Sequence, residues 1–84
     1  MSVILLKRYP NRKLYSSDLG RYITHVDVKT LITHAEKFIV VDLKTSKVVT
    51  TTTLLNLSAK AATEGRFADA ELFTKHAELM RGGI

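Results

Sequence analysis

A proline followed by an asparagine separates two short segments of strand-forming residues near the N-terminus. Residues 3–9 are rich in Val, Ile, Leu and Tyr, and a second short run follows the turn. Pro10 and Asn11 suit the two central positions of a β-turn, because proline presets φ and asparagine tolerates the left-handed conformation. The sequence therefore predicts an N-terminal β-hairpin with a two-residue loop, in which Arg8 lies opposite Lys13.

This register brings like charges together at the tip of the hairpin. It also places Lys7 opposite Leu14 and Leu6 opposite Tyr15. Like charges directly opposed on a ladder cost about 0.2–1 kcal/mol, so the arrangement is expected where an anion normally binds. The root of the hairpin is apolar and its tip is basic, which is typical of an element anchored in a core that projects charge outward.

Beyond the hairpin, helix and strand patterns alternate along the chain. Thr24 and Asp27 resemble a capping box, and apolar residues at helical spacing follow, so a helix is predicted from His25. The β-branched runs at residues 38–43 and 48–51 predict a second hairpin. The other predicted elements are a loop at residues 16–20, a strand at 21–24, a turn at 44–47, a helix from Leu54 to about Glu64 capped by Thr52 or Thr53 and closed by Gly65, and a third helix from about Ala68 to Arg81 that ends at Gly82-Gly83.

This order of elements predicts an α+β fold, with a small sheet of short, mainly antiparallel strands made of the two hairpins and packed with about three helices. With 84 residues, the chain is expected to form a single domain over residues 1–84. It has no cysteine, which excludes a disulfide framework and a thiolate zinc site. No stretch resembles a membrane span or a signal peptide, so we expect no membrane contact and a cytoplasmic location.

The positive charge is concentrated near the N-terminus. The net charge is +5, and residues 1–21 hold five basic side chains against one acidic side chain. A local basic cluster is typical of polyanion binding, and a two-stranded ribbon fits the major groove of DNA, where Arg and Asn read base edges. The candidate residues for binding double-stranded DNA are Lys7, Arg8, Tyr9, Asn11, Arg12, Lys13, Tyr15 and Arg21. The cations are expected on phosphates, with Asn11 and one arginine at base edges, and a homodimer or higher homo-oligomer would double the contact.

Three other interpretations of the same residues stay open. The basic residues could only keep an exposed edge strand soluble. They could instead dock an acidic protein partner, with an exposed patch of Phe67, Phe73 and Met80 on the third helix contributing. Single-stranded RNA could also stack on the three tyrosines. Salt-dependent binding of duplex DNA that is lost on Arg12→Ala distinguishes the hypothesis of DNA binding from these three interpretations.

No catalytic or cofactor-binding pattern is visible in the sequence. It has no glycine-rich phosphate loop and no nucleophile beside a base, so an enzyme is not expected. The histidines His25, His34 and His76 lack metal-ligand spacing, so neither a metal nor another cofactor is expected. We expect Asp42 to end its strand by hydrogen-bonding the following turn, and Asp18 to pair with Arg21.

Residues 7–15, Lys-Arg-Tyr-Pro-Asn-Arg-Lys-Leu-Tyr, closely resemble the signature that opens the DNA-binding domain of the bacterial polyhydroxyalkanoate (PHB/PHA) synthesis repressors. The resemblance continues through residues 21–24, 38–45 and, more weakly, 50–57, and residues 71–83 are similar to the close of the same domain. It thus extends over about residues 4–83.

The resemblance implies a cytoplasmic bacterial transcription regulator, a repressor of granule-protein and polymer-synthesis genes that is released when it is drawn onto polyhydroxyalkanoate granules. Two positions depart from the family pattern, since no glycine stands near Ser46 and Thr51 replaces a favoured arginine. Family members usually carry a further C-terminal region, whereas this sequence stops at Ile84. Polyhydroxyalkanoate granule binding is therefore not assigned to this chain, and a role in a different pathway stays open.

Overall fold

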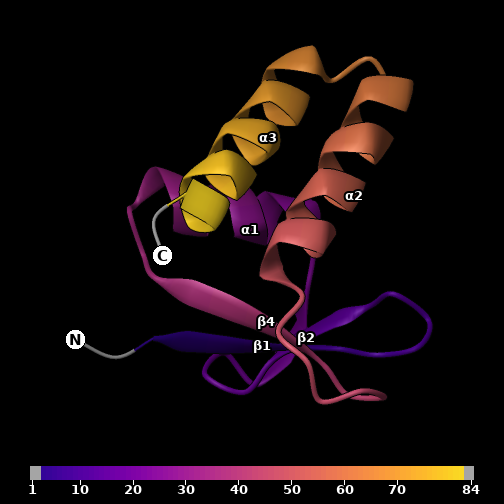
Figure 1. Cartoon of the computed structure of the whole chain (residues 1–84), viewed down its shortest axis with the longest axis vertical. Coiled ribbons are helices and arrows are strands. Elements are labelled where there is room, and N and C mark those ends of the chain that lie inside the picture. Colours follow the sequence, from indigo (N-terminus) through magenta and orange to yellow (C-terminus); the bar gives the residue numbers. More distant parts are fainter. Residues whose placement is uncertain (1–2, 83–84) are drawn as a thin grey trace. The chain divides into compact units, whose positions relative to one another are not determined.

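A computed structural model describes residues 3–82 and shows an α+β fold with a four-stranded mixed sheet and three helices, as predicted (Figure 1). The elements are β1 (Ile4–Arg8), β2 (Leu14–Ser16), β3 (Arg21–Ile23), α1 (His25–Thr33), β4 (Phe38–Asp42), α2 (Thr50–Thr63) and α3 (Phe67–Gly82). The chain divides after Val49 into two compact units, the first with the sheet and α1, the second with α2 and α3. The single domain predicted over residues 1–84 stays a prediction.

The sheet has the strand order β3-β2-β1-β4. The pairs β1–β2 and β2–β3 are antiparallel, in line with the predicted character of the sheet. The pair β1–β4 is parallel and runs in register from Ile4 opposite Phe38 to Arg8 opposite Asp42. Parallel strands end at the same edge of a sheet, so the turn after β1 and the loop after β4 emerge side by side.

The two faces of the sheet differ in burial because side chains alternate along each strand. One face carries the buried side chains Leu6, Leu14, Ser16, Ile23, Phe38 and Val40. The other face carries Leu5, Lys7, Tyr15, Tyr22, Ile39 and Val41, all exposed or half-buried. This second face carries aliphatic side chains on β4 and aromatic and basic side chains on β2, β3 and the end of β1.

The return strand of the predicted second hairpin is shorter than expected. Among the described residues it consists of one antiparallel bridge, Val41 with Val48, beside which Val49 N–H donates to Val40 O at 2.7 Å, and Thr50 already begins α2. The predicted start of that helix at Leu54 is therefore four residues too late. Threonine has β propensity, but its hydroxyl also suits the first turn of a helix, where backbone N–H groups lack helical partners. Tertiary context decides between the two, and the threonine run lies in the first turn of α2.

The helix α1 begins at His25, as predicted, and Thr24 and Asp27 form the predicted capping box. The Asp27 carboxylate accepts the Thr24 backbone N–H at 2.9 Å. At the other end, Ala35 N–H donates to Ile32 O at 3.0 Å and Glu36 N–H to Leu31 O at 2.9 Å. These two bonds are those of a Schellman motif. Ala35 accordingly adopts a positive φ of 55°.

The second unit is a hairpin of two helices. α2 ends at Thr63 and Gly65 has a φ of 77°, so the predicted closure by glycine is confirmed. α3 matches the predicted helix to within one residue at each end, and Gly83 lies outside the described residues. Phe73 and Ala77 of α3 are fully buried, as are Leu54 and Ala61 of α2. The Ser58 hydroxyl donates to Ala70 O at 2.8 Å, which joins the two helices.

Candidate nucleic-acid interface

The turn of the N-terminal hairpin has three loop residues instead of the two predicted. Arg12 N–H donates to Tyr9 O and Tyr9 N–H donates to Lys13 O, both at 2.9 Å. The residue with positive φ is Arg12, at 68°, and not Asn11. A two-residue hairpin loop needs positive φ at its first position, which proline cannot adopt. Pro10 therefore favours an ordinary turn, and a following left-handed residue restores the strand twist.

The longer loop shifts the pairing of the hairpin by one residue. The observed partners are Leu6 with Ser16, Lys7 with Tyr15 and Arg8 with Leu14. The predicted opposition of Arg8 and Lys13 is therefore wrong, and their pairing gives no indication of a bound anion. The new register separates the cations, because Lys7 shares a face of the sheet with Tyr15 while Arg8 shares the opposite face with Leu14.

Three tyrosines gather on the exposed face of the sheet. Tyr22 lies with its ring centroid 5.8 Å from that of Tyr9 and 5.4 Å from that of Tyr15, tilted in one case and edge-on in the other. The Lys13 ammonium lies 5.7 Å from the Tyr22 ring centroid. We call these residues, together with Lys7 in the same row, the tyrosine face. The rings brace the base of the turn against β3, and the lysines give the face its positive charge.

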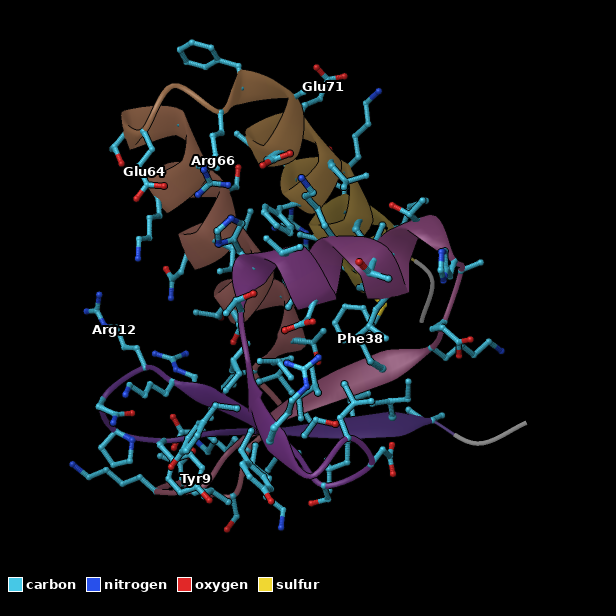
Figure 2. All side chains as sticks on the ribbon, turned by 180° about the vertical axis from the view of Figure 1, so that it is seen from behind. Tyr9, Arg12, Phe38, Glu64, Arg66 and Glu71 are labelled. Atoms are coloured by element: carbon cyan, nitrogen blue, oxygen red, sulfur yellow. The ribbon has the colours of Figure 1, made fainter. Side chains whose placement is uncertain are left out.

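The tip of the hairpin presents Asn11 and Arg12, both exposed. The Asn11 side-chain Oδ1 accepts the Lys13 backbone N–H at 3.0 Å, so this amide oxygen stabilises the turn and its NH₂ group remains as a donor. In Figure 2 the side chains of Arg12 and Tyr9 leave the hairpin on opposite sides. The turn thus holds an arginine on one side of the ribbon and the tyrosine face on the other.

Four cations of the hairpin, Lys7, Arg8, Arg12 and Lys13, define what we call the basic hairpin. Across residues 3–82, none of these four side chains takes part in an ion pair. By contrast, Arg66 pairs with both Glu64 and Asp69. Cations without counterions inside the chain give the hairpin a local positive potential, which attracts an external anion.

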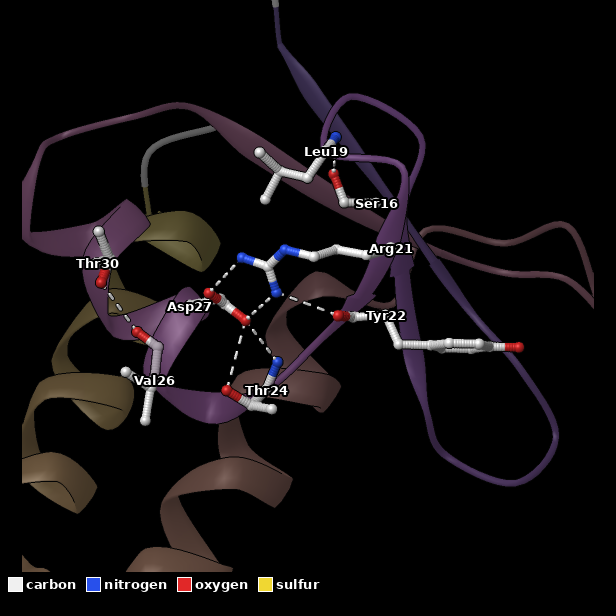
Figure 3. A network of polar contacts seen from close by, with 8 residues as sticks. All are labelled: Ser16, Leu19, Arg21, Tyr22, Thr24, Val26, Asp27 and Thr30. Carbon is white, nitrogen blue, oxygen red and sulfur yellow. Dashed lines mark hydrogen bonds and ion pairs between the residues drawn. The ribbon is translucent and has the colours of Figure 1, made fainter.

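Arg21, the eighth candidate, has a different environment. Its guanidinium donates to both carboxylate oxygens of Asp27, at 3.0 and 3.1 Å, and to Tyr22 O at 3.3 Å (Figure 3). The predicted pair of Arg21 with Asp18 is therefore wrong. Hydrogen bonds from the Arg21 side chain and the Thr24 backbone lower the pKa of Asp27 to about 2. Arg21 joins β3 to the start of α1, and its charge is compensated within the domain.

Other predicted roles have mixed outcomes. Asp42 ends β4 as expected, because its Oδ1 accepts the backbone N–H groups of Lys44 and Thr45 at 2.8 and 3.1 Å. The patch proposed on the third helix is wrong for Phe73, which is fully buried, although Phe67 is 71% exposed. Burial lowers the pKa of His76.

Within residues 3–82, no cluster of three or more metal-ligating side chains is found. No helix of this range has both the length and the apolar character of a membrane span.

Tyr22 also belongs to this surface, although the sequence suggested it only as a stacking platform for RNA and not among the candidate DNA contacts. The residue is 53% exposed, and its ring joins Tyr9 to Tyr15, although all three come from different segments. The signal was present in the alternation of the short strand 21–24, where Ile23 is buried and its neighbour must point to the opposite face. The register of β2 with β3, with Tyr15 opposite Tyr22, then decides the contact.

The chain was compared with known proteins. Residues 5–65 match the family described as the PHB/PHA accumulation regulator DNA-binding domain. The matched range includes the sheet, α1 and α2, and ends before α3 begins. The residues 71–83 that resemble the close of the domain therefore lie outside the match. No solved structure matches the chain.

Two curated bacterial proteins are similar to it. One, from Thiocystis violacea, is an uncharacterized protein in the phbA 5′ region that is 38% identical over 61 residues, covering 73% of this chain and 44% of the relative. The other, an uncharacterized protein of Allochromatium vinosum, is 36% identical over 62 residues, covering 74% of this chain and 40% of the relative. The chain thus spans less than half the length of these relatives.

The family is one of regulator DNA-binding domains and not of enzymes. With 61 matched residues out of 84, the chain belongs to the family of PHB/PHA accumulation regulator DNA-binding domains.

Proposed function

We propose that this domain binds double-stranded DNA through the basic hairpin and acts as a repressor in the bacterial cytoplasm. The observation that carries the proposal is the set of four cations, Lys7, Arg8, Arg12 and Lys13, that have no ion-pair partner across residues 3–82 and surround one rigid turn. The family supports DNA as the polyanion. The position of the Thiocystis relative in a phbA 5′ region supports genes of polyhydroxyalkanoate metabolism as targets.

The hairpin is a two-stranded antiparallel ribbon, a kind of element that can enter the major groove. Two strands joined by a tight turn fit the groove, and both sides of the ribbon then face a wall of phosphates. On one side, Lys7 and Lys13 stand beside the tyrosine face, whose hydroxyl groups can donate to phosphate oxygens. On the other side, Arg8 shares its face of the sheet with Leu14. Arg12 at the tip is the arginine best placed for a guanine edge.

Asn11 contributes less to base reading in this proposal than the sequence suggested. A bidentate contact with adenine needs both the amide oxygen and the NH₂ group. The oxygen already holds the turn through the Lys13 N–H, so the NH₂ donor is the part available to DNA. Arg21 is bound to Asp27 through both terminal nitrogens, and we assign it to positioning β3 and α1.

The substitution Arg12→Gly tests the proposal without a cost in folding. Glycine adopts the positive φ of this position freely, so the variant removes the charge and relaxes the backbone at once. We expect the melting temperature to stay equal or rise, and the affinity for duplex DNA, measured by fluorescence anisotropy at 0.1 M salt, to fall about tenfold or more. Arg81→Gln, at the end of α3 and beyond the family match, is the matched control and should keep full affinity.

The same titration distinguishes DNA binding from the competing function, that of a module that docks an acidic protein. That function predicts weak DNA binding of equal strength in the native chain and in Arg12→Gly. Equal affinities would contradict the proposal made here. Stacking of single-stranded RNA on the tyrosines finds less support, because Tyr22 is already in contact with two rings and with Lys13.

A further inference from the structure

The loop after β4, residues 43–47, lies beside the turn of the basic hairpin. β1 and β4 are parallel neighbours, and their last residues, Arg8 and Asp42, are paired. The Leu43 N–H donates to Arg8 O at 3.1 Å, which extends this contact past the ends of the strands. Figure 1 shows the turn after β1 and the loop after β4 leaving the sheet at the same end. The two segments are far apart in the chain, and only the parallel pairing brings them together.

This loop is held in one conformation by its own hydrogen bonds. Asp42 N–H donates to Lys47 O at 2.9 Å and Ser46 N–H to Asp42 O at 2.7 Å. The Asp42 carboxylate accepts two further N–H groups, and the Thr45 hydroxyl accepts the Lys47 N–H at 3.3 Å. Ser46 takes a positive φ of 61° to close the turn. A loop with this many internal bonds loses little conformational freedom when it binds a ligand.

The charge of the loop matches that of the neighbouring hairpin. Lys44 and Lys47 are both exposed. Neither takes part in an ion pair with any residue of the described chain. The one acidic neighbour, Asp42, directs a carboxylate oxygen to the backbone of the loop. The edge of the sheet therefore carries two adjacent loops of positive charge.

We propose that residues 43–47 form a second DNA-contacting loop, in which Lys44 and Lys47 bind phosphates next to those held by the basic hairpin. Neighbouring strands lie about 4.8 Å apart. Flexible cationic side chains on loops of adjacent strands can therefore bind neighbouring phosphates of the same DNA backbone. Lysine suits this role because it acts as a point charge on a flexible stem. The inference rests on the proposed function, since it assigns further residues to the same DNA contact.

The test compares lysines at the two ends of β4. Lys44→Gln, Lys47→Gln and the double variant remove charge from the loop while keeping side-chain length. Lys37→Gln is the matched control, because Lys37 lies at the other end of β1 and β4, where its backbone O accepts the Ile4 N–H at 2.9 Å. Duplex DNA is titrated by fluorescence anisotropy at several salt concentrations, and thermal melting confirms that each variant is folded.

We expect each loop substitution to make the slope of log K against log salt shallower by about 1 per bound chain, and the double variant by about 2. Lys37→Gln should leave the slope unchanged. If the loop variants keep the native slope while Arg12→Gly loses affinity, the second loop is overturned and the proposed function stands. If Arg12→Gly also binds like the native chain, the proposed function itself fails.

Discussion

Three residues other than glycine adopt positive φ in the described chain: Arg12, Ala35 and Ser46. This conformation costs of order 1 kcal/mol or more for a residue with a side chain, and it persists where the surrounding structure requires it. Two of the three lie in the loops that we assign to DNA. At Arg12 a glycine would fit the backbone better, but it would give up the guanidinium at the tip of the hairpin.

The Arg21–Asp27 pair also acts at the scale of single residues. It links the third strand to the first turn of α1 through a bidentate contact and a capping box. The pKa of Asp27 is lowered from its ordinary value of 3.8 to about 2, chiefly by the Arg21 side chain. A carboxyl group with a lowered pKa stabilises the fold as long as it is ionised.

We predict that this contribution is lost in acid. It is fully present above pH 3.8, the ordinary value, and disappears as the pH falls through about 2. Because the Arg21 side chain is half exposed, solvent screening reduces the contribution of the Arg21–Asp27 pair to the free energy of unfolding to about 1 kcal/mol. Urea denaturation of the native chain and of Asp27→Asn should show this difference in the free energy of unfolding at pH 7 and almost none at pH 2. A difference that is constant with pH would contradict the role of the charge.

At the scale of elements, the helices α1 and α2 end in the same motif with different residues. Gly65 N–H donates to Ala62 O at 3.1 Å and Arg66 N–H to Ala61 O at 2.8 Å, the bonds of a Schellman motif. Ala35 occupies the equivalent left-handed position after α1. No atom lies within 4 Å of a Cβ placed on Gly65, so a substitution there meets no steric clash.

We therefore predict opposite effects for two exchanges of glycine and alanine. Ala35→Gly should raise the free energy of unfolding by about 1 kcal/mol, and Gly65→Ala should lower it by about the same amount. Ala59→Gly, on the exposed side of α2 and inside the helix, is the control and should destabilise by about 1 kcal/mol because glycine weakens a helix interior. Urea denaturation followed by circular dichroism measures all three, and stabilisation by Ala59→Gly would refute the argument from φ.

At the scale of the whole molecule, the basic hairpin would offer only a small contact surface for the proposed DNA site. The family match ends at Gly65, and the chain spans less than half of its curated relatives. A single hairpin with four cations neutralises few phosphates. Two-fold pairing would double that number and match a palindromic site, so we propose that the chain binds DNA as a homodimer or higher homo-oligomer.

This proposal predicts the stoichiometry and the salt dependence of binding. Two chains per duplex site are expected by analytical ultracentrifugation. If the dimer neutralises about eight phosphates through its hairpins, log K should fall with log salt with a slope of about −7, and more steeply with the second loop engaged. One chain per site would contradict the dimer, and a slope shallower than about −2 would contradict phosphate contact as the source of affinity.

Local signals in the sequence predicted several elements correctly. The capping box at Thr24 and Asp27, the glycine closure at Gly65 and the limits of α3 involve residues within one or two turns of each other. The prediction of a two-residue hairpin loop was wrong, although the signal for the longer loop is also local, since Pro10 excludes the turns that a two-residue loop needs. These features follow from backbone sterics and from hydrogen bonds that the chain forms within a few residues.

The sequence by itself therefore determined the α+β character, the basic turn and the family of this domain. The tertiary structure alone decided which segments meet: β4 beside β1, Tyr22 between Tyr9 and Tyr15, and Arg21 on Asp27 rather than Asp18. The same pairing turned two separate basic segments into one edge. Strand order and register depend on packing between residues distant in the chain, which no local propensity specifies.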